Sequence, residues 1–278
     1  MIVLNGELVS KDKSLIPFNN RGTFYGDGVF ETLRLFKGKA LFFENHYFRL
    51  MSGMRIMRML IPESFTPEYF EKSFTDLISN TNFENTDHLR VRISVWRKEG
   101  GKYTPNSREV NFSIVMEPLG SSFENKETCE VELFKDFYIY ADLLSNQKTI
   151  DKKVNILAGI FAKENSYDDM FLMNHNKMII ETISGNVFLR KDNIIKTPPL
   201  SDGCLNGIMR EQVIDQLKKM INYEIVEETI TPFELQRADE IFTTNVIKGI
   251  QSISKYRKKT YSRDAATELL SLLKEKLF

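Results

Sequence analysis

The sequence predicts an α+β protein of two domains, and three observations lead to this prediction. Segments with alternating apolar residues are typical of strands. Other segments carry apolar residues at helical spacing. A polar stretch with Pro, Gly and Ser, EPLGSSFENKET at 117–128, separates two patterned halves. We therefore expect a first domain at 1–117, a linker at 118–127 and a second domain at 128–278, with antiparallel or mixed sheets.

Local signals define the elements of the first half. The dipeptide Asn5-Gly6 predicts a hairpin turn, and the helical spacing from Leu50 to Met57 predicts a helix. Thr66 is suited to cap a second helix that has proline in its first turn. In chain order we expect a hairpin over 1–10, a strand over 28–36, helices over 46–59 and 67–79, and strands over 88–96 and 111–116.

The second half combines short strands with three helices. No internal repeat or low-complexity segment interrupts the pattern. In chain order we expect a strand over 129–140, a helix over 153–165, strands over 169–174, 177–181, 186–190 and 193–196, a helix over 207–222, strands over 223–230 and 240–244, a turn, and a last helix over 263–277.

Composition excludes several classes of function. The 278 residues include 38 basic and 38 acidic ones, so net charge gives no reason to expect a nucleic acid or an anionic membrane as a partner. Two cysteines cannot form a disulfide framework, and the three histidines show no metal-ligand spacing. The start MIVLNGELVS lacks signal-peptide character, and no apolar stretch approaches the roughly 18 residues of a membrane span. We expect a cytoplasmic protein without a metal.

Two motifs in the first half contain groups suited to binding. RGTFYGDGVFETLRLF, at 21–36, places three glycines and an aromatic pair before a strand, although a tight turn alone explains the glycines. In HYFRL, at 46–50, Arg49 lies about one helical turn after His46. An arginine at that position is suited to hold a phosphate or to face solvent.

Two motifs in the second half also contain groups suited to binding. In IIETISGNVFL, at 179–189, Glu181 ends an apolar strand and either needs a partner or faces water. In TPPLSDGCLNGIMREQVI, at 197–214, a helix begins near Gly207. The free N–H groups of such a start suit an anion, but every helix has them.

A lysine cluster precedes the predicted helix at 153–165. The segment SNQKTIDKKVNILAGIFAKEN, at 145–165, contains four lysines: Lys148, Lys152, Lys153 and Lys163. A lysine amine with an ordinary pKa of about 10.4 is protonated near neutral pH. Burial and nearby cations lower that pKa and make the amine a nucleophile. The cluster is therefore either a solvated basic patch or the source of one reactive lysine.

Taken together, the motifs resemble those of the class IV aminotransferases. GDGVFETLR, HxxRL, a lysine before a helix, ETxSGN-F, TPPL…GxxxGIMR and ADEIF follow one another in that family's order from about residue 5 to 253. The resemblance implies a pyridoxal-phosphate enzyme of fold type IV, with a small N-terminal domain and a larger C-terminal pseudo-barrel domain. It also implies a homodimer. The family contains branched-chain and D-amino acid aminotransferases and aminodeoxychorismate lyases.

The resemblance selects one lysine. The family's cofactor-bonding lysine lies about 33 residues before the glutamate that contacts the pyridine nitrogen, and Lys148 lies 33 positions before Glu181. Lys152 is the second choice, and Lys163 is expected to face solvent. The family pattern has Asn three positions after the lysine, where this chain has Asp151.

Further cofactor contacts follow from the same resemblance. Arg49 and the backbone N–H groups of Ile208 and Met209 are expected to hold the phosphate, with a backbone contact from the Asn245-Val246 turn. Many relatives have Thr at the position of Met209 and again near Val246. Without those hydroxyls, the phosphate site is expected to depend more on main chain.

The resemblance also bears on the reaction. The GGKY of WRKEGGKYTP, at 96–105, and the short N-terminus look most like aminodeoxychorismate lyases, which release pyruvate and give 4-aminobenzoate, a folate precursor. Candidate substrate residues are Arg97, Lys102, Tyr103 and Lys152, although the loop residues are equally suited to a solvated, mobile loop. The alternatives are a branched-chain or D-amino acid aminotransferase and, third, a non-catalytic homologue that binds the cofactor.

Overall fold

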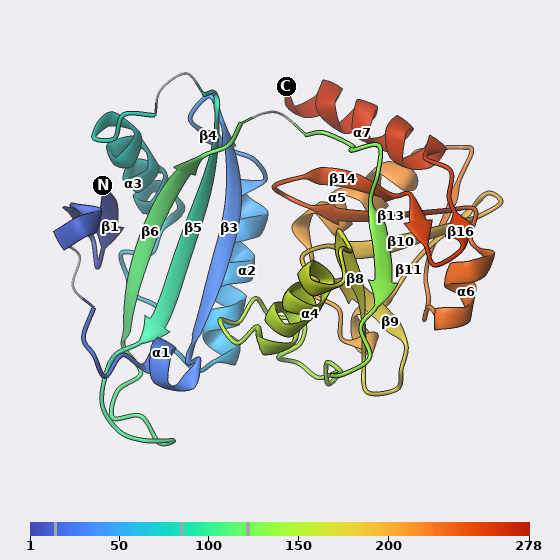
Figure 1. The fold of residues 1–278 in the computed structure, drawn as a ribbon. Coiled ribbons are helices and arrows are strands. Elements are labelled where there is room, and N and C mark those ends of the chain that lie inside the picture. Colours follow the sequence, from blue (N-terminus) through green and yellow to red (C-terminus); the bar gives the residue numbers. More distant parts are fainter. Residues whose placement is uncertain (14–15, 84–85, 121–122) are drawn as a thin grey trace. The chain divides into compact units, whose positions relative to one another are not determined.

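The structure is a computed structural model that describes residues 1–13, 16–83, 86–120 and 123–278 (Figure 1). Internal contacts divide the chain into two units. Unit 1 contains Met1–Ser122 together with Gln147–Asp151, and unit 2 contains Phe123–Asn146 and Lys152–Phe278. Residues 121 and 122 of the predicted linker lie outside the described residues. Within the described ranges, no helix is long and apolar enough to cross a membrane.

Unit 1 is built on an antiparallel sheet in the order β2-β1-β6-β5-β3-β4. The strands are β1 (Ile2–Leu4), β2 (Glu7–Val9), β3 (Gly28–Phe36), β4 (Lys39–Ala40), β5 (His88–Arg97) and β6 (Val110–Pro118). The helices are the 3-10 turn η1 (Lys11–Lys13), α1 (Arg21–Tyr25), α2 (Phe43–Ile56) and α3 (Pro67–Ser79). Thr66 accepts a hydrogen bond from the Tyr69 N–H at 3.2 Å, which confirms the predicted cap of α3.

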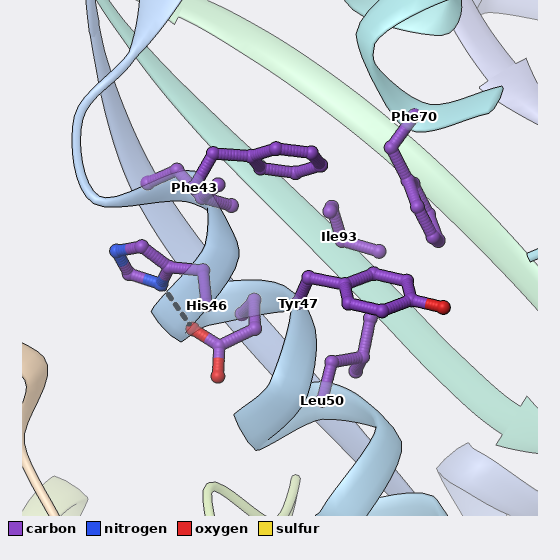
Figure 2. Close-up of a pocket in the computed structure, with 8 residues that line it drawn as sticks. Phe43, His46, Tyr47, Leu50, Phe70 and Ile93 are labelled. Atoms are coloured by element: carbon purple, nitrogen blue, oxygen red, sulfur yellow. Dashed lines mark hydrogen bonds and ion pairs between the residues drawn. The ribbon is translucent and has the colours of Figure 1, made fainter. Parts of the chain in front are cut away.

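Strand alternation gives the unit 1 sheet two different faces. Leu33 and Leu35 of β3 belong to the apolar core that α2 and α3 share with β5 and β6. The space between Glu31, α2 and Phe70 of α3 is too small to hold a water molecule, so it is packed core (Figure 2). The residues between the core positions point to the opposite face. On β3 these are Phe30, Thr32, Arg34 and Phe36, opposite Ser94, Arg92, Arg90 and His88 of β5.

Unit 2 contains a mixed sheet whose main path is β12-β11-β10-β9-β8-β7-β15-β16, while β13 pairs with β10 and β14. Its strands are β7 (Glu130–Leu133), β8 (Asp169–Met173), β9 (Ile179–Thr182), β10 (Asn186–Lys191), β11 (Ile194–Thr197), β12 (Glu224–Glu227), β13 (Glu240–Asn245), β14 (Gly249–Ile253), β15 (Lys255–Tyr256) and β16 (Lys259–Thr260). Its helices are α4 (Lys153–Glu164), the 3-10 turn η2 (Leu200–Asp202), α5 (Ile208–Leu217), α6 (Pro232–Arg237) and α7 (Asp264–Leu277).

The structure confirms the mixed helix-and-sheet class and corrects several elements. The strand expected over 129–140 ends at Leu133, and beyond it only an isolated bridge joins Ile139 to Asn174. The region after 244, expected as a turn, instead forms β14, β15 and β16. The helix expected over 207–222 ends at Leu217. The short helices α1 and α6 were not predicted, because fewer than two helical turns give little periodicity.

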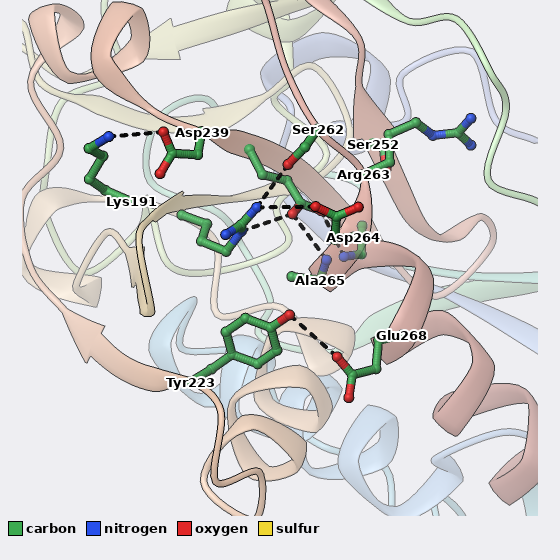
Figure 3. A network of polar contacts seen from close by, with 12 residues as sticks. Lys191, Tyr223, Asp239, Ser252, Ser262, Arg263, Asp264, Ala265 and Glu268 are labelled. Carbon is green, nitrogen blue, oxygen red and sulfur yellow. Dashed lines mark hydrogen bonds and ion pairs between the residues drawn. The ribbon is translucent and has the colours of Figure 1, made fainter.

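A buried carboxylate joins β10, β13 and α7 in unit 2 (Figure 3). Glu240 is fully buried and accepts hydrogen bonds from Arg190 Nε at 3.0 Å and from the Ala265 and Ala266 N–H groups at 3.0 and 2.8 Å. Those two N–H groups belong to the first turn of α7, where no helix carbonyl can accept from them. Glu240 therefore caps α7 and neutralises Arg190 at one point.

We expect Glu240→Gln to lower the free energy of unfolding by about 3 kcal/mol, because the change leaves Arg190 without its buried counter-charge. Asp264→Asn is the matched control, since the Asp264 side chain also contacts Arg190 but is 78% exposed. Its cost should stay below about 1 kcal/mol in urea unfolding. Equal effects of the two variants would contradict a central role for Glu240.

Candidate active site

The segment Gln147–Asp151 attaches to the start of β3 by main-chain hydrogen bonds. The Phe30 N–H donates to the Lys148 carbonyl at 2.8 Å, and the Ile150 N–H donates to the Gly28 carbonyl at 2.9 Å. A Cβ on Gly28 would lie 2.7 Å from the backbone carbonyl oxygen of Val95 in β5 and 2.3 Å from Ile150 Cδ1, and because the carbonyl belongs to the backbone, position 28 requires glycine. Lys148 therefore belongs to unit 1, next to β3.

The Lys148 side chain lies against an aromatic ring. Its Nζ is 4.7 Å from the centroid of the Phe30 ring, and Arg92 Cζ is 3.9 Å from the same centroid. The face of an aromatic ring attracts cations. The lysine amine is thus held at the β3–β5 face of unit 1 and is half-buried.

On the opposite face of β3, Glu31 is bonded to two cationic side chains. Arg49 Nε donates to Glu31 Oε1 at 2.7 Å, and Arg49 Nη2 donates to Oε2 at 2.7 Å. His46 Nδ1 lies 2.7 Å from Oε2 (Figure 2). Burial alone would raise the pKa of Glu31, but the charge of Arg49 and the hydrogen bonds from Arg49 and His46 lower it from 4.5 to about 2.

His46 is a neutral imidazole in this arrangement. Burial lowers the pKa of His46 below its ordinary 6.5, the Glu31 interactions oppose that change, and the charges of Arg49 and Lys148 add to it. Because ionised Glu31 can only accept, His46 Nδ1 carries the proton. Within the described ranges, the buried Nε2 has no hydrogen-bond partner. The influence of Lys148 on His46 links the two sides of β3 electrostatically.

Arg49, predicted to hold a phosphate, is 11% exposed and uses one edge of its guanidinium for Glu31. A fixed edge orients the rest of the group, which is how a bidentate pair adds geometric specificity. Its role toward a phosphate stays a prediction.

Arg97, predicted as a substrate residue, is buried at 6% exposure and bonded within unit 1. Its Nε donates to Asp27 at 2.9 Å and its Nη2 to the Met57 carbonyl at 2.6 Å. Arg21 shares Asp27 at 2.8 Å and also donates to the carbonyls of the loop at 100–102. Arg21 therefore anchors this loop, and Arg97 shares the carboxylate of Asp27 with Arg21.

The loop itself carries two more predicted substrate residues. Lys102 and Tyr103 are exposed, Tyr103 to 92%, and the Tyr103 ring packs edge-on to Tyr25 at 5.9 Å. A Cβ on Gly101 would lie 2.1 Å from the Thr104 carbonyl, so the loop requires glycine there. The remaining candidate, Lys152, is half-buried at the N-cap of α4 in unit 2.

In unit 2, Glu181 is a 9% exposed carboxylate near the end of β9. Its Oε2 accepts a hydrogen bond from the Leu205 N–H at 3.0 Å. The same loop is tied to β10, because Asn186 Nδ2 donates to the Leu205 carbonyl at 2.8 Å. The predicted pyridine-binding residue is therefore fixed to the loop that leads into α5.

Three turns meet at the start of β10. A Cβ on Gly207, the N-cap of α5, would lie 1.8 Å from Asn186 Oδ1, so α5 begins in close contact with β10. Asn245 Nδ2 donates to the Ser184 carbonyl at 3.2 Å, which ties the Asn245-Val246 turn to the β9–β10 turn. The structure thus brings together, within unit 2, the end of β9 with Glu181, the start of α5 with Ile208 and Met209, and the turn with Asn245 and Val246.

The donors at this junction suit a phosphate. The N–H groups of Ile208 and Met209 lie in the first turn of α5, where the helix provides no acceptor. Thr244 directly precedes Asn245 in the sequence. Its buried hydroxyl has no hydrogen-bond partner among the described residues. Thr244 was not among the predicted site residues, because alternation alone does not distinguish a functional hydroxyl from a core threonine.

Comparison with known proteins decides the family. The family model for amino-transferase class IV matches residues 28–256. The chain belongs to the class IV aminotransferase family. Enzymes of this family use pyridoxal phosphate, and one similar solved structure, from Thermobaculum terrenum, is in its PLP form.

Two curated relatives of this class IV aminotransferase are transaminases. A putative branched-chain-amino-acid aminotransferase of Methanocaldococcus jannaschii is 28% identical, over 99% of this chain and 94% of its own. A D-alanine aminotransferase of Staphylococcus aureus (strain N315) is 26% identical, over 91% and 88%.

Two solved structures share the fold. A branched-chain aminotransferase from Thermoproteus uzoniensis has a TM-score of 0.89 at 22% identity, covering 99% of this chain and 93% of its own. A putative 4-amino-4-deoxychorismate lyase from Legionella pneumophila has a TM-score of 0.82 at 22% identity, covering 95% and 96%. These likenesses confirm the fold-type IV architecture.

Glu31→Gln should destabilise unit 1 by about 3 kcal/mol near neutral pH, because Arg49 loses its buried counter-charge. The folded pKa of Glu31 lies below its ordinary value, so its contribution is complete above pH 4.5 and is lost as the pH falls toward 2. The gap between the wild-type protein and the variant should therefore shrink at about pH 3.

Trp96, the single tryptophan, lies in β5 of unit 1, and its fluorescence during urea unfolding measures this effect. Glu117→Gln is the control, because Glu117 pairs with Arg90 at 51% exposure. A gap that is the same at both pH values would show that the Glu31 charge is not the cause.

Proposed function

We propose that the protein catalyses pyridoxal-phosphate-dependent transfer of an amino group between an amino acid and a 2-oxo acid. The observation that supports this most is the fixed position of Lys148, whose main chain is bonded to β3 and whose amine lies over Phe30. The curated transaminase relatives, which match 91–99% of the chain, support the same class of reaction.

In unit 1, Lys148 would form the covalent bond with the cofactor aldehyde. Displaced by a substrate amine, its Nζ would then carry the proton removed from the substrate α-carbon. Arg49, with one guanidinium edge fixed by Glu31, would bind a phosphate oxygen.

In unit 2, Glu181 would keep the pyridine nitrogen protonated, as a neighbouring carboxylate does. The Leu205 N–H holds the carboxylate of Glu181 in place for this role. The N–H groups of Ile208 and Met209, with the Asn245-Val246 turn, would hold the phosphate. The bound cofactor supplies an electron sink for the charge that develops at the substrate α-carbon.

The second candidate is 4-amino-4-deoxychorismate lyase activity. It is favoured by the GGKY loop and by the likeness to the Legionella pneumophila structure. Its dianionic substrate needs cations, and Arg97 is already bonded to Asp27 and to main-chain carbonyls. Lys102, Tyr103 and Lys152 remain candidates for that substrate. We rank amino transfer first because one of the three candidate cations for the lyase substrate, Arg97, is used internally by the fold.

Lys148→Ala should abolish the visible absorbance of bound cofactor and lower turnover by at least about 100-fold, because the bond-forming amine is lost. Lys152→Ala and Lys153→Ala are matched controls from the same cluster and should keep the absorbance. Borohydride reduction followed by peptide mass spectrometry should label Lys148. Labelling of Lys152 would transfer the role to that residue, and a colourless protein that cannot be reconstituted would support a non-catalytic homologue.

Substrate trials separate the two reactions. Leucine or D-alanine with 2-oxoglutarate should give glutamate, while aminodeoxychorismate should give no pyruvate. Release of pyruvate and 4-aminobenzoate without glutamate formation would instead establish the lyase. The proposed assembly is a homodimer, which sedimentation equilibrium would test.

A further inference from the structure

In unit 2, the side chain of Asn146 holds the loop over 198–206, which lies between β11 and α5. Asn146 Nδ2 donates to the Leu200 carbonyl at 2.9 Å and to the Cys204 carbonyl at 2.7 Å. The backbone carbonyl of Asn146 accepts from the Asn206 N–H at 3.3 Å. Both hydrogens of the Nδ2 group are therefore used, which fixes the orientation of the side-chain amide.

One peptide group of this loop connects Asn146 to Glu181. The Cys204 carbonyl, which accepts from Asn146, and the Leu205 N–H belong to the same planar peptide unit. That N–H donates to Glu181 Oε2 at 3.0 Å. The direction of the N–H bond is thus set by the hydrogen bond at the other end of the peptide. Hydrogen bonds in such a chain also polarise and strengthen one another.

Two further asparagines hold the same loop at other points. Asn174 Nδ2 donates to the Asp202 carbonyl at 2.9 Å. Asn186 Nδ2 donates to the Leu205 carbonyl at 2.8 Å. Neither carbonyl belongs to the peptide whose N–H reaches the carboxylate. Asn146 therefore differs from the other two by its place in the chain of hydrogen bonds, while all three hold the loop.

The loop also lies directly against the segment that carries Asn146. A Cβ on Gly203 would lie 2.8 Å from the backbone Cα of Ala141, and the φ of Gly203 is +97°. This backbone contact opposes any movement of the loop toward a shortened side chain at position 146. Loss of the amide therefore removes a donor from the Cys204 carbonyl without allowing the loop to close the gap.

We propose that Asn146 is a positioning residue for Glu181. Through the peptide between Cys204 and Leu205, it aims the N–H that holds one carboxylate oxygen. A carboxylate held in this way presents a fixed orientation to the pyridine nitrogen of the cofactor. The inference rests on the proposed function, in which Glu181 keeps that nitrogen protonated.

The test compares two cofactors in the full-length protein after its bound cofactor has been removed. Pyridoxal phosphate and its deaza analogue, which has C–H in place of the pyridine nitrogen, share the aldehyde and the phosphate. Equilibrium dialysis of the wild-type protein should show a preference for pyridoxal phosphate of at least about tenfold, because only this cofactor forms a charge-assisted hydrogen bond with Glu181. Asn146→Ala should lower the preference at least about fivefold, whereas a merely structural change weakens both cofactors alike.

Asn146→Asp and Asn174→Asp are a matched pair, because each replaces an amide that donates to the loop by a carboxylate that cannot donate. Asn146→Asp should lower the preference, and Asn174→Asp should leave it within about twofold of wild type. Glu181→Ala should abolish the preference, and adding Asn146→Ala to it should change nothing further. Circular dichroism verifies that each variant is folded, and if Asn146→Ala fails this check, Asn146→Asp decides the question.

The outcomes separate this inference from the proposed function. A preference that survives in the folded Asn146 variants, or that falls equally in Asn174→Asp, would overturn the role of Asn146. If Glu181→Ala still abolishes the preference in that case, the proposed role of Glu181 stands. No preference in the wild-type protein would refute the role of Glu181 and, with it, the role of Asn146.

Discussion

The main-chain pairing of 148–150 with 28–30 is the constraint on which the candidate site of unit 1 depends. It fixes Lys148 to β3 through backbone atoms, so the position of the amine does not rely on side-chain packing alone. Position 28 requires glycine, since a Cβ there would lie 2.7 Å from the backbone carbonyl oxygen of Val95 and would also displace the Ile150 side chain. Because alternate residues of a strand face opposite sides, Phe30 then lies with Lys148, while the next residue, Glu31, points into the core.

The alternation places a buried acid, Glu31, on the core face of β3, and its partners explain why it is tolerated there. An isolated carboxylate in the core would take up a proton, but Glu31 is bonded to Arg49 and His46 and remains ionised. The same contacts fix the ring of His46 and one edge of Arg49. Removing Glu31 would therefore leave a buried cation unpaired, which costs more than the pair itself contributes to stability. Glu31 thus orients Arg49, which is proposed to bind the phosphate, and does not itself contact the phosphate.

Local sequence signals were sufficient for the elements with clear periodicity or caps, such as β3, β5 and α3. They failed for β14 to β16, of which β14 and β16 pair with the preceding strands β13 and β15 and only β15 also pairs with a distant strand, β7. They failed as well for 134–140, where apolar residues leave the sheet. Lys148 was chosen by its distance to Glu181, a family property. Its attachment to β3 is a long-range contact that no local pattern contains. Arg97 shows the same limit, because its sequence neighbourhood suggested a mobile loop and its partner Asp27 lies 70 positions away.

The contrast between Arg97 and Arg92 shows that two arginines of β5 differ in how their charges are met. Arg97 is nearly inaccessible, and its charge is met by Asp27 and by the Met57 and Arg58 carbonyls, so adding a substrate anion would require breaking existing bonds. Arg92 has lost part of its hydration without gaining an acid, and a cation–π contact returns only about 1 kcal/mol. Stability alone does not account for an arginine at position 92.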